Sequence, residues 1–140
     1  MLRLPMTQIK NNEKQLTTKS FLVSETDEKG IITFANDDFC TYAGYALDEL
    51  IGQPHSIVRH PDMPKAAFAD LWETIKRGER WRGFVKNLSK DGSFYWVYAT
   101  VFPFESCDGS RGYISCRRKV SSMEAEKYTL AYQDMKREER

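Results

Sequence analysis

Three strand-like segments fill the second half of the chain, and a short turn separates each from the next. The segments are 82–88, 94–104 and 112–120, and the turns contain Asp91-Gly92 and Asp108-Gly109. An Asp-Gly pair between two β-rich runs is a strong hairpin signal. Because a hairpin joins neighbouring strands in opposite directions, this half of the chain predicts a three-stranded antiparallel sheet.

The first half adds two strands and several short helices. Apolar runs at 21–23 and 31–35 flank a turn that contains Gly30, which predicts another hairpin. The side-chain oxygen of Asn36 can cap the helix that follows it. Helices are expected at 39–43, 47–51 and 64–77, with a loop at 55–63. This order predicts an α+β fold, in which a five-stranded antiparallel sheet has the helices gathered on one side.

The chain divides into three regions. Residues 1–20 are polar and are expected to form a mobile arm or N-terminal cap outside the main core. Residues 21–120 hold all predicted strands and form the main domain. Residues 121–140 are helical in character, with an apolar seam that can pack on a neighbour. The sequence therefore predicts one domain with a C-terminal helix or linker.

Composition excludes several classes of protein. The net charge is +1, from 21 basic and 20 acidic residues, which gives no reason to expect a nucleic-acid surface. No apolar run approaches the ~20 residues that span a bilayer, and the N-terminus lacks the apolar region of a signal peptide. The three cysteines, Cys40, Cys107 and Cys116, have no CxxC spacing, so neither a zinc site nor a disulfide framework is expected. We therefore expect a cytoplasmic protein that does not insert into membranes.

The segment Arg59-His60-Pro61-Asp62-Met63-Pro64 concentrates ionisable groups on a stiff loop. Its prolines fix the backbone, and a guanidinium, an imidazole and a carboxylate lie between them. From the residues alone, an ion pair between Arg59 and Asp62 that ties the loop to the next helix is the favoured interpretation.

Two segments resemble the PAS family. Residues 30–52, GIITFANDDFCTYAGYALDELIG, are similar to the opening of PAS domains. Residues 52–65, GQPHSIVRHPDMPK, resemble the PAS domains of bacterial aerotaxis receptors, which are flavin-based energy sensors. The matching pieces AFADLW, GERWRGFVKN and YWV follow, and the resemblance covers about residues 23–119. It implies the PAS fold and a sensory function.

The resemblance implies that Arg59, His60 and Asp62 take part in binding FAD, where a guanidinium can hold a phosphate or a ring carbonyl through paired hydrogen bonds. Trp81 and Trp72 offer flat apolar surfaces to a flavin or adenine ring. Both also fit a plain core position, and Trp81 is the stronger pocket candidate.

Three further side chains are weaker candidates for the cofactor site. Asn87 has both a donor and an acceptor for the pyrimidine edge of a flavin, and a bond to neighbouring backbone is an equal alternative. Asn36 fits a helix cap better than a pocket position, although the resemblance makes it a candidate. His55 is the weakest candidate, because it also fits a role that only shapes the loop.

The cofactor has several alternatives to FAD: FMN, haem and none. A cysteinyl-flavin photocycle of the light-oxygen-voltage type is excluded, because GQPHSIVRH has no cysteine. Haem would need an axial histidine, for which His60 and His55 are the candidates. No GxGxxG or GxxxxGK[ST] loop is present, so a dinucleotide would not be held as in Rossmann or P-loop proteins.

The resemblance implies a redox or oxygen sensor for energy taxis, whose partner is a membrane-bound chemotaxis-type transducer or another signalling protein. If the chain is a whole protein, its signal must pass to that separate partner; a homodimer is a further arrangement. The alternatives are a haem-binding gas sensor and a cofactor-free interaction module. Nothing in the sequence pairs a nucleophile with a base, so we do not expect an enzyme.

Overall fold

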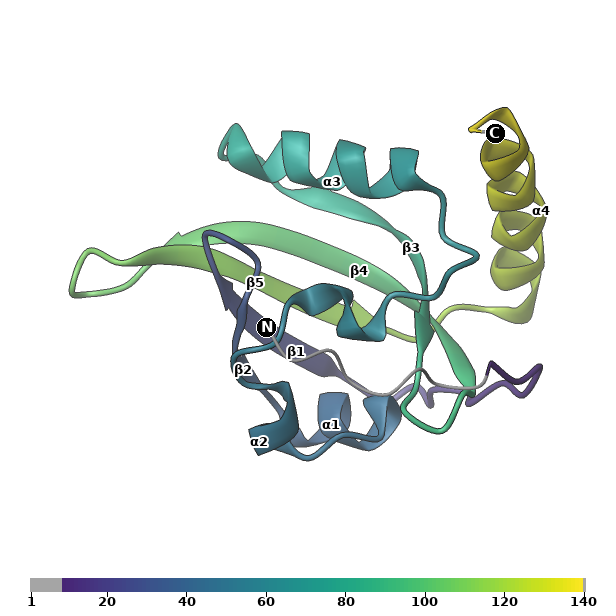
Figure 1. The fold of residues 1–140 in the computed structure, drawn as a ribbon, viewed down its shortest axis with the longest axis horizontal. Coiled ribbons are helices and arrows are strands. Elements are labelled where there is room, and N and C mark those ends of the chain that lie inside the picture. Colours follow the sequence, from purple (N-terminus) through teal and green to yellow (C-terminus); the bar gives the residue numbers. More distant parts are fainter. Residues whose placement is uncertain (1–8, 140) are drawn as a thin grey trace.

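Hydrogen bonds join five strands into one antiparallel sheet in the computed structural model, which describes residues 9–139 (Figure 1). The sheet order is β2-β1-β5-β4-β3, so the last strand of the chain lies at the centre. The elements are β1 (Leu22–Asp27), β2 (Ile32–Ala35), α1 (Asp37–Ala43), α2 (Leu47–Leu50), the 3₁₀ helix η1 (His55–Val58), α3 (Lys65–Lys76), β3 (Trp81–Leu88), β4 (Phe94–Glu105), β5 (Arg111–Arg118) and α4 (Ser122–Glu138). The predicted α+β fold with a five-stranded antiparallel sheet is confirmed.

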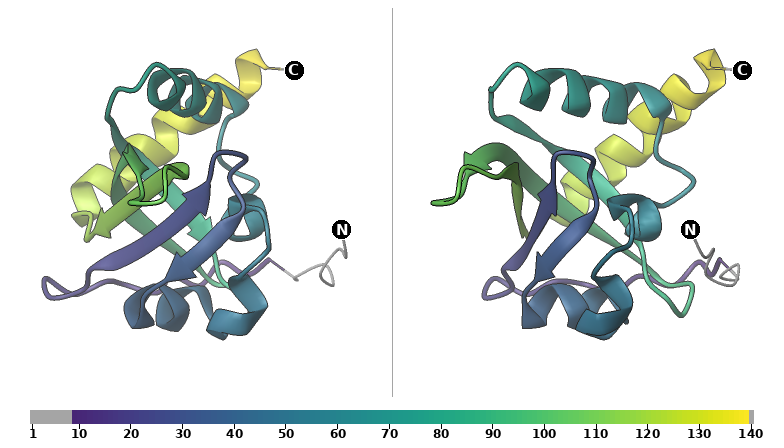
Figure 2. Two further views of the ribbon diagram at one scale, coloured as in Figure 1. Left: turned by 90° about the vertical axis from the view of Figure 1, so that its left-hand side faces the viewer. Right: turned by 60° about the vertical axis from the view of Figure 1, so that its left-hand side comes forward.

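The register of the sheet decides which side chains share a face. Ser115 of β5 is opposite Ser24 of β1 and Val101 of β4, and Val85 of β3 is opposite Val97 of β4. Because successive side chains of a strand point to opposite faces, these residues share one face. This inner face lies under α1, α2, η1 and α3, and it carries the hydrophobic core (Figure 2).

The C-terminal helix packs on the opposite, outer face at the β3 edge. Tyr128 stacks on Phe84 of β3 with ring centroids 4.2 Å apart, and Tyr132 stacks on Trp96 of β4 at 6.1 Å. Phe84 and Trp96 point to the outer face because they alternate with the inward-facing residues of their strands. The prediction that the short helices gather on one side is therefore confirmed for α1 to α3, and α4 is the separate C-terminal helix.

The described part of the N-terminal region, residues 9–20, lies against the β3–β4 turn. The amides of Lys10 and Lys14 donate to the carbonyls of Gly92 and Phe94. Leu16 is 4% exposed and belongs to the hydrophobic core, although residues 1–20 were predicted to lie outside it. Residues 1–8 of the predicted arm lie outside the described range. Within the described range, the structure contains no helix long and apolar enough to cross a membrane.

Candidate functional site

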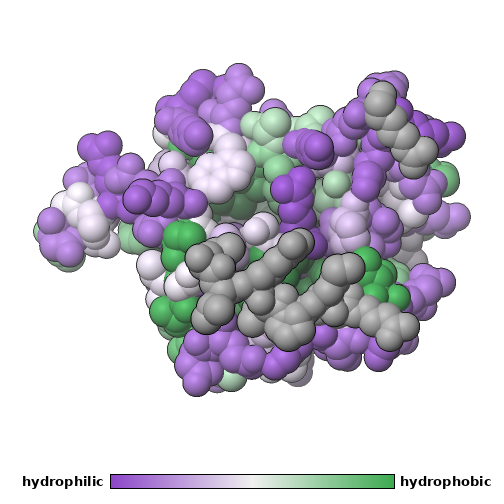
Figure 3. Space-filling model, viewed as in Figure 1, coloured by the Kyte–Doolittle hydropathy of each residue, from purple (hydrophilic) through white to green (hydrophobic). Residues whose placement is uncertain are grey.

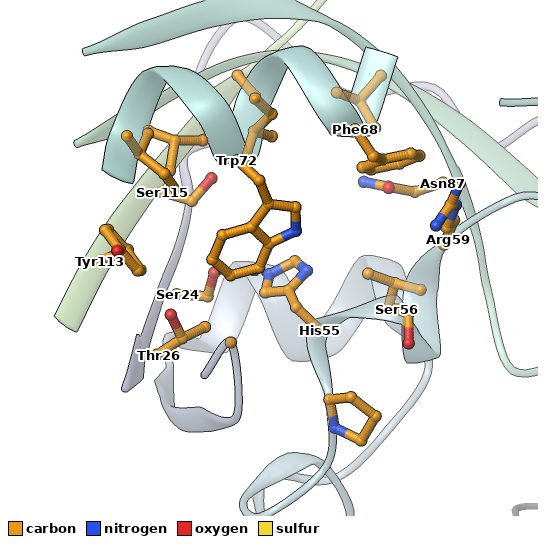
Figure 4. A pocket seen from close by; sticks show the side chains of 18 of the residues that line it. Ser24, Thr26, His55, Ser56, Arg59, Phe68, Trp72, Asn87, Tyr113 and Ser115 are labelled. Carbon is orange, nitrogen blue, oxygen red and sulfur yellow. Dashed lines mark hydrogen bonds between the residues drawn. The ribbon is translucent and has the colours of Figure 1, made fainter. Parts of the chain in front are cut away.

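A cavity of about 520 Å³ lies between the inner face of the sheet and helix α3. This volume falls within the range of about 300–1,000 Å³ that is typical of sites for small molecules and cofactors. Side chains of β1, η1, α3, β3, β4 and β5 form its walls (Figure 4). On the face shown in Figure 3, apolar surface lies in a recess below α3.

Polar side chains lie on the inner face of the sheet, although a sheet face that is covered by helices is normally apolar. Ser24 and Thr26 of β1, Ser115 of β5 and Asn87 of β3 all line the cavity and are at most 8% exposed. Among the described residues, three side-chain atoms are buried without a hydrogen-bond partner, and two of them, Asn87 Nδ2 and Ser115 Oγ, belong to residues that line the cavity. The two residues lie toward opposite ends of the cavity in Figure 4. Since buried polar groups are nearly always paired, these atoms indicate a ligand with polar groups.

Arg117 gives the cavity wall a positive charge. It lies on the central strand β5, is 4% exposed, and donates to Ser24 Oγ at 3.1 Å and to His55 Nε2 at 2.7 Å. No carboxylate of residues 9–139 lies within 4.0 Å of its guanidinium nitrogens. Burial lowers the pKa of Arg117 to about 10, so the group remains charged at neutral pH. A buried charge without a counter-ion is costly, and the cavity is therefore suited to a group that is negative or rich in acceptors.

His55 is neutral at physiological pH. Its pKa is lowered to about 3, first by burial and then by the positive charge of Arg117. Because its Nε2 accepts the hydrogen bond from Arg117, the proton of the neutral ring lies on Nδ1. The ring also meets Phe39 edge to face, with centroids 5.8 Å apart. His55 thus lines the cavity as a fixed, uncharged partner of the arginine.

Acidification should destabilise the fold through His55. Its pKa is about 3 in the fold against 6.5 ordinarily, so between these values the unfolded chain binds more protons and the free energy of unfolding falls as the pH falls. Urea unfolding at pH 7 and pH 5 should show a loss of roughly 1–2 kcal/mol. His55→Asn should remove most of this loss, leaving a smaller part from His60, whose pKa burial also lowers. A variant with the full parental loss would rule out His55 as its source.

The structure separates the three ionisable residues of the Arg59–Pro64 loop. Arg59 lines the cavity, with its guanidinium carbon 3.9 Å from the centre of the Phe68 ring. His60 is 3% exposed, and its Nδ1 accepts from the amide of Asp62. Asp62 pairs with Lys86 of β3 at 2.8 Å rather than with Arg59. Only Arg59 of the three therefore lines the cavity.

Of the two candidate tryptophans, Trp72 lines the cavity and Trp81, the stronger candidate from the sequence, does not. Trp72 of α3 lines the cavity, meets Tyr113 edge to face with centroids 5.7 Å apart, and lies against Gly30. A Cβ at Gly30 would approach the Trp72 ring to 2.9 Å, so this close contact requires glycine. Trp81 is absent from the cavity wall; its ring covers Gly83 and its Nε1 donates to Asp70 at 2.9 Å.

The two candidate asparagines have different roles. Asn87 lines the cavity with its free amide nitrogen. Asn36 does not line it; its Oδ1 accepts from the amides of Phe39 and Val23, and its Nδ2 donates to the carbonyl of Phe21. This side chain caps α1, as the residues alone had favoured, and it has no bonding capacity directed at the cavity.

Sequence reasoning missed Arg117, Ser24 and Ser115. A signal was present, because Tyr113, Ser115 and Arg117 follow one another at every second position of the last strand. Polar residues on a single face of a strand predict that this face meets either solvent or a site. The tertiary fold was needed to choose between them, since it is the covering by η1 and α3 that buries this face of β5. The described residues contain no group of three His, Cys, Asp or Glu side chains placed to hold a metal ion.

Comparisons with known proteins agree with this geometry. A family model described as PAS fold matches residues 32–117. The aerotaxis receptor of Escherichia coli (strain K12) is 50% identical over 109 residues, which are 78% of this chain and 22% of the receptor. A nitrogen fixation regulatory protein of Klebsiella pneumoniae is 30% identical over 103 residues, or 73% of this chain and 21% of that protein. The chain thus spans about a fifth of the length of these curated relatives.

Solved structures share the fold. A light-oxygen-voltage domain, from work with a flavin analogue, has a TM-score of 0.64 at 25% identity, covering 91% of this chain and 90% of that one. The blue-light activated histidine kinase of Erythrobacter litoralis has a TM-score of 0.66 at 15% identity, covering 81% of this chain and 39% of that one. The second likeness shows the fold alone.

Proposed function

This chain belongs to the PAS fold family, and on that premise we propose that it is a redox sensor whose cavity binds a flavin and whose surface reports the flavin's state to a signalling partner. The observation that carries the proposal is Arg117, a buried cation on the cavity wall without a carboxylate partner among the described residues. The kinship to an aerotaxis receptor supports the sensory part of the proposal.

The free polar groups of the cavity match the chemistry of a flavin ring. Such a ring presents carbonyl oxygens and ring nitrogens on one edge and an apolar surface elsewhere. Asn87 Nδ2 is a buried donor that lacks an acceptor. Trp72, Leu71 and Val101 supply apolar wall surface. We assign Asn87 and Arg117 to the polar edge of the ring and these apolar residues to its faces.

When bound, a flavin would supply reversible uptake of electrons, which changes the charge and protonation of its ring. Arg117 would stabilise added negative charge, since a cation acts strongly in a buried site. Its bonds to Ser24 and His55 hold the guanidinium in place. If negative charge draws Arg117 away from Ser24 and His55, the contacts of β5 with β1 and η1 that these bonds make must rearrange. This is a change that the outer face of the sheet can transmit.

We further propose FAD rather than FMN. Besides Arg117, three further cations line the cavity, namely Arg59, Lys29 and Lys65. Cations of this kind can neutralise the two phosphates of a dinucleotide. His60 and Asp62 would act indirectly. Asp62 pairs with Lys86, and its amide donates to His60; these two bonds fix the loop that carries Arg59. The partner in this proposal is a membrane-bound chemotaxis-type transducer that meets the domain in the cytoplasm.

The visible absorption spectrum of the purified protein tests the proposal. We expect the paired near-ultraviolet and blue bands of an oxidised flavin, and chromatography of the released chromophore should identify FAD. Released FMN would overturn the FAD assignment alone. A Soret band would replace the flavin with haem. A colourless protein that does not bind added FAD or FMN would leave a cofactor-free interaction module and would refute the proposal.

A further inference from the structure

The start of helix α3 lacks a cap from its own sequence. Pro64 occupies the N-cap position and has no side chain able to accept a hydrogen bond, and the first turn of α3 contains no acidic residue. The first amides of a helix need acceptors from outside the helix. Here the acceptor is the carboxylate of Glu139, at the end of α4. It accepts from the amides of Lys65 at 3.0 Å and Ala66 at 2.8 Å.

Helix α3 is also a wall of the cavity. Lys65, Phe68 and Trp72 line it from successive turns of the helix, and Phe68 holds the Arg59 guanidinium on its ring. The two amides capped by Glu139 therefore belong to the turn that positions Lys65 and Phe68. A second tie lies beside the cap, where Lys136 of α4 donates to the carbonyl of Pro61. The end of α4 thus holds the loop and the helix that close the cavity at this side.

Helix α4 itself is held by few contacts. None of its side chains is fully buried, and Met123 and Leu130 are 82% and 60% exposed. Its other anchors are Tyr128, which stacks on Phe84, and Tyr132, which stacks on Trp96 and donates its hydroxyl to the carbonyl of Phe84 at 2.6 Å. Elements with little buried apolar surface open at low free-energy cost. Tyr128 and Tyr132 hold the middle of α4, whereas the Glu139 cap and the bond from Lys136 to Pro61 hold its C-terminal end.

We propose that Glu139 is a distant N-cap through which the seating of α4 and the closure of α3 over the cavity form one coupled equilibrium. A ligand that favours closed α3 then favours seated α4, and release of α4 loosens the grip on the ligand, since coupling between two sites is reciprocal. The inference rests on the proposed function only for the identity of the ligand. Glu139 is a positioning residue in this scheme and does not touch the cofactor.

The test compares Glu139→Ala with a matched control, Glu138→Gln, in the full chain. Glu138 is the neighbouring exposed acid of α4 and caps nothing in α3. The first measurement is amide hydrogen exchange by NMR without added cofactor. Glu139→Ala should speed amide exchange at Lys65 and Ala66, and it should speed exchange along α4 as well. The control should leave the exchange rates of both helices unchanged. Faster exchange at Lys65 and Ala66 alone would overturn the coupling.

The second measurement is the release rate of bound FAD. We expect release from Glu139→Ala to be roughly three- to tenfold faster than from Glu138→Gln, the size that loss of a helix cap allows. Equal release rates would overturn the link to the cavity, even if both helices lose protection. If no variant binds any flavin, the proposed function fails, and the exchange experiment alone still decides whether Glu139 couples the two helices.

Discussion

Arg117→Met should lower the reduction potential of the bound flavin by on the order of 100 mV. Two opposite unit charges 4 Å apart attract by about 4 kcal/mol at an effective dielectric constant of about 20. Losing half of this interaction would shift a one-electron step by about 90 mV. The direction follows from the sign of the charge, because the cation favours the state in which the ring has gained an electron. Spectroelectrochemical titration measures the shift.

The same substitution should leave the empty protein as stable as the parent, or more stable. Arg117 is a buried cation that no carboxylate compensates within the described range, and replacing buried charge with apolar groups of similar volume is often neutral or stabilising. Arg117→Lys is the control, since it keeps the charge and loses the two-pronged bonding to Ser24 and His55. Its potential should stay nearer the parental value. A parental potential in Arg117→Met would show that this charge does not act on the ring.

The strands and turns were predictable because local chemistry decides them. Gly30, Gly92 and Gly109 all adopt positive φ at turns that the sequence predicted, and glycine is the residue that does so without strain. A short apolar run between two such turns predicts a β-strand rather than a helix. The order of strands in the sheet is a long-range property, and the central place of β5 was therefore not visible. Without it, Arg117 looked like one more basic residue of a terminal strand.

Trp81 and Trp72 show a second limit, which concerns side-chain direction. Trp81 is opposite Val101, an inward-facing position by strand alternation. Its ring nevertheless turns along the strand to cover Gly83 and to reach Asp70. The direction of the Trp81 ring depends on Gly83 of the same strand, which leaves room for it, and on the Asp70 carboxylate of α3, which accepts its hydrogen bond. In the same way, Asp62 has Lys86 as its partner because β3 passes beside the loop. A residue motif names the groups at a site, and the tertiary contacts decide which of them face the cavity.

Asn87→Leu should stabilise the empty protein and weaken flavin binding at the same time. Asn87 is 3% exposed, and its Nδ2 has no hydrogen-bond partner. A buried donor left unpaired costs about 1–3 kcal/mol, and leucine of similar size removes that cost. The free energy of urea unfolding should therefore rise by about 1–2 kcal/mol without cofactor. If Asn87 donates to the ring, the dissociation constant for FAD should rise by roughly ten- to a hundredfold.

Asn36→Leu is the matched control for this opposite pair of effects. The Asn36 side chain is fully engaged at the start of α1 and lies outside the cavity wall. Its loss should lower the free energy of unfolding by about 1–2 kcal/mol and leave FAD affinity nearly unchanged. If Asn87→Leu instead destabilised the empty protein, the amide would have a partner there already and would not be held open for a ligand. If stability rose while affinity stayed parental, Asn87 would be an orphan donor that the flavin does not use.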